Sequence, residues 1–377
     1  MSEFYPTAST SSKGAQTLPG RYFSCETIFK EEIDRIFFSR WLCIGRQEQI
    51  PNPGDYFLWQ IGLESIIVLR DRNAEVRAFY NICRHRGTRL CTQQQGNFAK
   101  TISCPYHAWA YNLDGRLLVA PLMNELEDFY QQDYPLYPVT IATWEGFLFL
   151  NLAKSPEPFI TAFAPLISKF SQWQLPTLRV VYSIEYQVRA NWKLIFQNYS
   201  ECYHCPTIHP ALAKQSFYRS GENNLFEGSF LGGFMTIEKP GGSLTMSGSR
   251  CAMPLGNISG EDLQRVYYYS IFPNMFLSLH PDYVMVHRLS PESPDRTRII
   301  CEWLFDPKSI DLTTFNPQDA VELWDLTNRQ DWQMCELMQA GVTSRAWTHG
   351  PYATAESLLA AFDREYLKAI GHLAPKD

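Results

Sequence analysis

Two short strings in the first third of the chain each combine a cysteine with a histidine. Cys83 and His85 lie in the string Cys-Arg-His-Arg-Gly, and Cys104 and His107 lie in Cys-Pro-Tyr-His. Thiolates and imidazoles are common metal ligands, and each string contains a glycine or proline that favours a turn after a strand. The two strings therefore predict one metal site with two sulfur and two nitrogen ligands. Zinc and a [2Fe–2S] cluster both use this donor set.

The order of the ligands favours the iron–sulfur cluster. Zinc fingers usually take both cysteines from one arm and both histidines from the other. Here each arm supplies one of each, so each arm can reach both irons of a two-iron cluster. The C-x-H-R-G and C-P-x-H-x-W patterns closely resemble the cluster-binding loops of Rieske proteins. We expect Cys83, His85, Cys104 and His107 to hold a Rieske [2Fe–2S] cluster.

A second group of candidate ligands follows about 100 residues later. Residues 191–205 are expected to form a helix that ends where a proline follows Cys205. Glu201 and His204 are three residues apart and would share a helical face. His209 would lie on the exit loop and fold back toward His204. Two histidines and a carboxylate form the facial triad of non-haem Fe(II) oxygenases, which leaves positions open for O2.

Asp331 is the expected carboxylate of this triad. It lies in a segment from Pro317 to Ala340 that is predicted to be helical, and it is the single charge in an apolar stripe. A buried carboxylate needs a partner, and a metal ion is one such partner. A structural ion pair at Asp331 is the alternative. Three other acids of this segment lie off the stripe and are weaker candidates, namely Glu322, Asp325 and Glu336.

The composition is that of a folded protein that binds neither nucleic acid nor membrane. The 377 residues are 45% hydrophobic and 19% charged, which suggests two or three domains. Lys and Arg number 33 against 39 Asp and Glu, a poor balance for binding phosphate backbones. With no apolar run of ~18 residues and no secretory signal, we expect a cytoplasmic protein. Most of the ten cysteines are expected to be free.

The pattern of apolar residues divides the chain into three parts. Residues 1–42 form a leader and an amphipathic helix, which we expect to pack on the catalytic domain. Residues 43–156 contain short apolar or alternating runs between turn signals, which predict an all-β domain. Residues 157–377 combine further strand-like runs with the long helix, and form the expected iron-containing catalytic domain.

With both groups of ligands in place, the chain resembles the catalytic α subunit of Rieske non-haem iron oxygenases from about Pro19 to Gly341. The resemblance implies an α+β fold, with an all-β Rieske domain and a helix-grip catalytic domain whose antiparallel sheet is flanked by helices. It also implies a homotrimer in which the cluster of one subunit serves the mononuclear iron of its neighbour. Glu201 would bridge His204 and His107 of the partner subunit, and Asn198 is the second expected catalytic residue.

The string from Asn198 to Cys205 resembles family members that act on choline, glycine betaine, carnitine or stachydrine. This implies a monooxygenase that uses O2 to hydroxylate or N-demethylate a small quaternary ammonium substrate. Electrons would come from a separate NAD(P)H-dependent flavin or ferredoxin-type reductase. The alternatives are an aromatic-ring hydroxylating dioxygenase α subunit, a Rieske electron carrier and a zinc-stabilised binding module. Aromatic faces bind quaternary ammonium groups, and the candidates are Tyr267, Tyr268, Tyr269, Phe272 and Tyr283.

Overall fold

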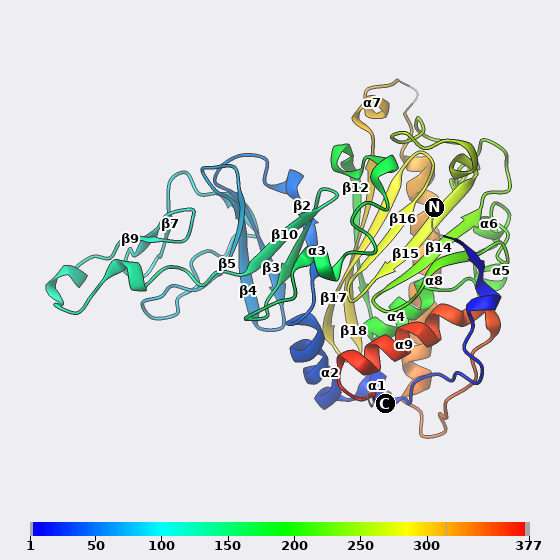
Figure 1. Cartoon of the computed structure of the whole chain (residues 1–377), viewed down its shortest axis with the longest axis horizontal. Helices are drawn as coiled ribbons and strands as arrows, with labels where there is room; N and C mark the ends of the chain where they lie inside the picture. The colour runs from blue at the N-terminus through cyan, green and yellow to red at the C-terminus, as the bar shows by residue number, and fades with distance from the viewer. Residues whose placement is uncertain (1–2, 314, 374–377) are drawn as a thin grey trace. The chain divides into compact units, whose positions relative to one another are not determined.

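The computed structural model describes residues 3–313 and 315–373 (Figure 1). Its contacts divide the chain into two compact units. One unit is Phe37–Ala162, and the other combines the chain up to Ile36 with the chain from Phe163 onward. The N-terminal segment is therefore part of the same compact unit as the C-terminal half. No helix in the described ranges has the length and apolar character needed to cross a membrane.

The unit of residues 37–162 is built from three small antiparallel sheets, with strand orders β10-β11-β2, β5-β4-β3-β6 and β7-β8-β9. One short helix, α3 (Phe159–Ala162), ends the unit. The turn at residues 112–115 joins β8 and β9, which pair as an antiparallel hairpin. The strands are β2 (Leu42–Arg46), β3 (Asp55–Ile61), β4 (Glu64–Arg70), β5 (Val76–Tyr80), β6 (Gln95–Asn97), β7 (Ile102–Ser103), β8 (Ala110–Tyr111), β9 (Leu117–Val119), β10 (Thr140–Trp144) and β11 (Phe147–Asn151).

The other unit contains an eight-stranded antiparallel sheet in the order β1-β13-β14-β15-β16-β17-β18-β12. Its strands are rich in β-branched and aromatic residues, which favour a pleated, half-buried surface. This sheet contains strand-like runs expected within residues 157–377. The strands are β1 (Tyr5–Pro6), β12 (Arg179–Val188), β13 (Glu222–Glu227), β14 (Phe230–Thr236), β15 (Arg265–Ile271), β16 (Met275–Leu279), β17 (Val284–Ser293) and β18 (Arg296–Phe305).

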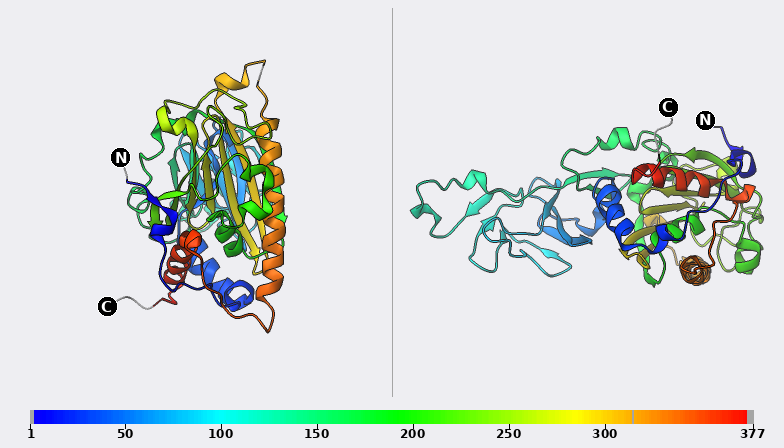
Figure 2. Two further views of the ribbon diagram at one scale, coloured as in Figure 1. Left: turned by 90° about the vertical axis from the view of Figure 1, so that its right-hand side faces the viewer. Right: turned by 90° about the horizontal axis from the view of Figure 1, so that it is seen from below.

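Helices α4 (Trp192–Tyr199) and α8 (Gln318–Val342) lie on one side of this sheet (Figure 2). Tyr199 of α4 stacks on Phe276 of β16, with ring centroids 4.1 Å apart. Asn328 of α8 contacts His287 of β17. The α+β fold with helices against an antiparallel sheet is confirmed. The remaining helices of this unit are α1 (Arg21–Ser24), α2 (Glu26–Glu32), α5 (Cys205–Ile208), α6 (Pro210–Ala213), α7 (Pro307–Ile310) and α9 (Ser357–Ala369).

A buried ion pair holds the N-terminal helices to α4. Glu32 and Lys193 have no exposed side-chain surface, and their charged atoms are 2.5 Å apart. Trp192 and Tyr366 also donate hydrogen bonds to the Glu32 carboxylate. Of the amphipathic helix expected within residues 1–42, α2 covers Glu26–Glu32 and a π-helical segment follows at Ile33–Phe37.

Candidate active site

The two cysteine–histidine loops of the all-β unit have matching backbone turns. The N–H of Gly87 donates to the carbonyl of Cys83 at 3.0 Å, and the N–H of Ala108 donates to that of Cys104 at 3.2 Å. Gly87 and Ala108 both adopt positive φ, at 75° and 57°. This left-handed conformation is easy for glycine and uncommon for alanine. Each cysteine therefore begins a tight loop that carries its histidine.

The four predicted cluster ligands lie together. Cys83 and Cys104 are 3% and 4% exposed, and their thiols are close enough to interact. The rings of His85 and His107 are 4.7 Å apart between centroids, and His85 stacks on Trp109. The buried Nδ1 of His85 has no hydrogen-bond partner within the described residues, so its lone pair is available to a metal. Two buried thiols beside two half-buried imidazoles fit a Rieske cluster.

Tyr111 adds a contact to this group that the sequence did not indicate. Its hydroxyl lies 3.3 Å from Sγ of Cys83 and accepts a hydrogen bond from the N–H of Arg84 at 3.0 Å. Because the oxygen accepts from Arg84, its own proton is available to the sulfur. Hydrogen bonds to cluster sulfurs help to set the reduction potential. Tyr111 is thus positioned to stabilise the more negative, reduced state of a bound cluster.

The helix that precedes the second group of ligands ends sooner than predicted. Asn191 caps α4 by accepting from the N–H of Lys193, and the helix ends at Tyr199. The prediction that Glu201 and His204 share a helical face was therefore wrong. The Glu201 carboxylate instead accepts from the backbone N–H groups of Tyr203 and His204. These local hydrogen bonds offer the backbone an alternative to the helix.

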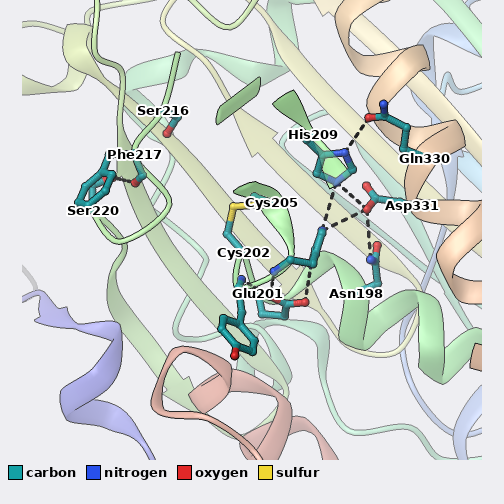
Figure 3. The surroundings of a disulfide bond; sticks show 12 residues. Asn198, Glu201, Cys202, Cys205, His209, Ser216, Phe217, Ser220, Gln330 and Asp331 are labelled. Carbon is teal, nitrogen blue, oxygen red and sulfur yellow. Dashed lines mark hydrogen bonds and ion pairs between the residues drawn. A yellow bond between two sulfur atoms is a disulfide. The ribbon is translucent and has the colours of Figure 1, made fainter. Parts of the chain in front are cut away.

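A disulfide between Cys202 and Cys205 closes the same turn (Figure 3). It was not predicted, because the ten cysteines are too few to indicate a disulfide scaffold. The chain then forms the short helix α5 and leads into His209. The turn therefore places Glu201 and both histidines within a compact segment.

His204, His209 and Asp331 converge on one point. The Nε2 atoms of the two histidines are 3.2 Å apart, and they lie 3.2 Å and 2.9 Å from Oδ1 of Asp331. Figure 3 shows His209 pointing at Asp331, which comes from α8. Ligand atoms about 2.1 Å from a metal at right angles to each other lie about 3 Å apart. The triangle therefore has the size of one face of a metal coordination sphere.

Each member of the triangle has a further partner that fixes its orientation. Nδ1 of His204 donates to Oε1 of Glu201 at 2.5 Å, and Nδ1 of His209 donates to Oε1 of Gln330 at 2.8 Å. Asn198 donates to Asp331 at 3.2 Å. With both Nδ1 atoms committed as donors, loss of the Nε2 proton leaves two lone pairs facing each other. A cation between them removes this repulsion, so the residues fit a mononuclear metal.

The carboxylates also control the charge of the site before iron binds. Burial alone would lower the pKa of His204, but Asp331 and Glu201 outweigh it and raise the pKa to about 10. Burial would raise the pKa of Asp331, yet hydrogen bonds from both histidines lower it overall. The site therefore holds a proton near neutral pH that a metal must displace.

Iron binding is expected to strengthen as pH rises. A histidine binds metal only as the neutral ring, and the proton on His204 leaves more readily at higher pH. We expect the apparent affinity for ferrous iron to rise by up to about tenfold per pH unit between pH 6.5 and 8.5, below the pKa of about 10. Competition with a ferrous chelator, in anaerobic buffers across this range, measures the slope. An affinity independent of pH would contradict the expectation.

Gln330 is a residue that the sequence did not single out, and the structure gives it a role. Its side chain orients His209, which is 1% exposed. We expect Gln330→Leu to weaken ferrous iron binding roughly 10- to 100-fold, the usual cost of losing an outer partner of a ligating histidine. Gln333→Leu is the matched control, because Gln333 is exposed on the same helix. Equal iron affinities in the two variants would show that Gln330 does not support iron binding through His209.

The triad opens onto a cavity of about 620 Å³, a volume typical of small-molecule sites. Tyr199, Tyr268 and Trp324 line it together with Asn198 and Asp331. The rings of Tyr199 and Tyr268 are 6.1 Å apart between centroids, and those of Tyr268 and Trp324 are 6.3 Å apart. Both pairs are edge-on. Three aromatic rings therefore form one wall beside the triad.

Of the five aromatic candidates from the sequence, Tyr268 is the one that lines this cavity. Successive side chains of a strand point to opposite faces of the sheet. Tyr267 and Tyr269 accordingly lie on the other face, against Trp173 and Phe170. Two others are used in packing: Phe272 contacts Trp192, and Tyr283 accepts a hydrogen bond from Trp324. Sequence reasoning missed Tyr199 and Trp324, which come from helices α4 and α8.

The two units and their sites define a two-centre iron protein, and comparisons with known proteins agree. Residues 40–134 match the Rieske [2Fe-2S] domain, and residues 175–372 match the catalytic domain of the ring hydroxylating alpha subunit. The chain belongs to the ring-hydroxylating α-subunit family of Rieske oxygenases. It is an oxidoreductase that carries a [2Fe–2S] cluster and a mononuclear iron, and its electrons come from a separate reductase.

Three known proteins are similar to this chain over most of its length. The glycine betaine monooxygenase oxygenase subunit of Chromohalobacter salexigens is 32% identical over 377 residues, covering 90% of this chain and 82% of that protein. The quaternary ammonium Rieske monooxygenase CntA in complex with L-carnitine has a TM-score of 0.79, with 23% identity over 97% of this chain and 98% of that one. Naphthalene 1,2-dioxygenase from Rhodococcus sp. shares the fold, with a TM-score of 0.74, 18% identity and 95% coverage of each chain.

Proposed function

We propose that this chain is a monooxygenase component that hydroxylates or N-demethylates a small quaternary ammonium compound. The observation that carries the proposal is the aromatic wall of Tyr199, Tyr268 and Trp324 beside the triad. A quaternary ammonium donates no hydrogen bonds, so aromatic faces are its natural hosts. Burial raises the pKa of Tyr268 well above its ordinary value, so the phenol stays neutral. The relation to a glycine betaine monooxygenase supports the same substrate class.

We assign the predicted ligands to two centres. Cys83, His85, Cys104 and His107 would hold the cluster, and His204, His209 and Asp331 would hold the mononuclear iron. When bound, the cluster supplies single electrons and the mononuclear iron activates O2. Asn198 keeps Asp331 in place through its hydrogen bond, and the cavity wall would hold a substrate beside the triad. Hydroxylation of an N-methyl group gives a hemiaminal, which collapses to formaldehyde and the demethylated amine.

We infer that the active assembly is a homotrimer in which electrons pass between subunits. A solved structure of a related quaternary ammonium monooxygenase is described as revealing inter-subunit electron transfer. The carboxylate of Glu201 holds His204 and would connect it to His107 of the partner subunit. Large apolar side chains of the all-β unit are exposed, as expected of a surface that another subunit covers. They include Tyr106, Leu118, Val119, Leu122, Leu126 and Tyr130.

Turnover with a reductase tests the substrate class directly. The oxygenase with both iron centres is combined with an NAD(P)H-dependent reductase and offered glycine betaine, choline, carnitine, stachydrine and aromatic acids. We expect release of formaldehyde, or of an aldehyde from choline, coupled to NAD(P)H oxidation. Formation of a cis-dihydrodiol from an aromatic compound, without turnover of any quaternary amine, would instead support the dioxygenase alternative.

A further inference from the structure

The charged side chains that line the cavity differ in whether they form ion pairs with other described residues. The two lining carboxylates, Glu201 and Asp331, both hold histidines of the triad. Apart from the histidines, Arg219 is the one cationic residue among the described residues that line the cavity. It forms no ion pair with any residue in the ranges 3–313 and 315–373. Its side chain is exposed, so the guanidinium is accessible to an anionic group of a ligand in the cavity.

The segment that carries Arg219 is held in place against the sheet. Ser216 is 4% exposed and donates to the carbonyl of Thr236, at the end of β14. The N–H of Thr236 donates to Oγ of Ser220 at 3.0 Å. Figure 3 shows Ser216 and Ser220 on this segment, near the disulfide-closed turn of the active site. The two anchors on either side of Arg219 therefore keep it at the cavity, and its guanidinium lies 5.2 Å from the ring centroid of Tyr218.

The cavity thus has two chemically different parts. The aromatic wall of Tyr199, Tyr268 and Trp324 suits a quaternary ammonium, and Arg219 suits an anion. An arginine fork matches the geometry of a carboxylate, with which it forms paired hydrogen bonds. A zwitterion that carries both groups would contact both parts at once. Binding at two points would also limit which N-methyl group faces the triad.

We propose that Arg219 binds the carboxylate of a zwitterionic substrate, so that the enzyme prefers betaines to choline. This inference rests on the proposed quaternary ammonium function and specifies its substrate class. Choline carries the same trimethylammonium group with a hydroxyl in place of the carboxylate, so it lacks the group that Arg219 recognises. Betaines with one or three methylenes between nitrogen and carboxylate differ in reach, and the better ligand of the two reports the span between the two parts of the cavity.

Equilibrium binding to the holoenzyme under anaerobic conditions tests the inference without turnover. Calorimetry measures dissociation constants for glycine betaine, γ-butyrobetaine and choline with wild type, Arg219→Gln, Arg219→Lys and Lys214→Gln. Lys214 is the matched control, since it is exposed on the same segment and does not line the cavity. We expect Arg219→Gln to weaken the preferred betaine about five- to tenfold, with choline unchanged and Lys214→Gln like wild type. Arg219→Lys should recover part of the loss.

Two results would overturn the inference about Arg219 and leave the proposed function intact. One is an unchanged betaine affinity in Arg219→Gln, and the other is an equal loss of betaine and choline, which indicates a structural role. If wild type binds none of the three compounds, the proposed function fails, and the inference fails with it. The wild-type measurement therefore separates the two failures.

Discussion

Replacing Asp331 by alanine is expected to remove the mononuclear iron and abolish substrate turnover, while the cluster stays intact. Oδ1 of Asp331 lies 2.9 Å and 3.2 Å from the two histidine nitrogens, and it is the negative charge of the triad. Loss of an outer partner alone costs roughly 10- to 100-fold, so loss of a ligand should cost more. The variant should fold, because it removes a charged group from a largely buried position.

Iron analysis, cluster absorbance and product formation together check this expectation. The matched control is Glu322→Gln, which removes one acid from the exposed side of the same helix. We expect the control to keep its iron and its activity. An Asp331→Ala protein that retains full mononuclear iron and turnover would show that the carboxylate ligand lies elsewhere. We expect the thermal unfolding temperature of Asp331→Ala to stay close to that of wild type.

Glu201→Gln is expected to slow product formation about 100-fold while both iron centres remain. The carboxylate accepts from Nδ1 of His204 and from two backbone N–H groups of the turn. Glutamine keeps the size of the side chain but removes its charge. The proposed connection between His204 and His107 of the partner subunit depends on that carboxylate. Electrons should therefore remain on the cluster.

Stopped-flow absorbance measures this step directly. The chemically reduced variant is mixed with O2 and substrate, and we expect the reduced cluster to persist where the wild type reoxidises. Glu356→Gln is the control. Glu356 lies near enough to interact electrostatically with Glu201. Its carboxylate accepts from the backbone N–H of Ala353, away from the histidines of the triad. Cluster reoxidation at the wild-type rate in Glu201→Gln would exclude the proposed connection.

At the predicted mononuclear iron site, the local sequence pattern indicated Asp331 correctly as a neighbour of the two histidines, but it misplaced the end of the preceding helix. The apolar stripe around Asp331 marked the one acid of its helix that needs a buried partner, and the structure brings it to His204 and His209. The helix prediction failed at Tyr199, because backbone N–H groups that donate to the Glu201 carboxylate and a disulfide support a turn there. The histidines converge despite that error, since the turn brings them to the same position.

The amino-acid sequence by itself indicated the residues of the two predicted ligand sets, the order of the all-β and mixed parts, and several strands of the large sheet. These features depend on residue type, spacing and alternation, which local sequence contains. The tertiary structure decided which aromatic side chains reach the cavity, that Gln330 contacts His209 and Tyr111 contacts Cys83, and that Arg219 lines the cavity. Such contacts join residues far apart in the chain, and their positions follow from strand register and helix packing, which no local pattern specifies.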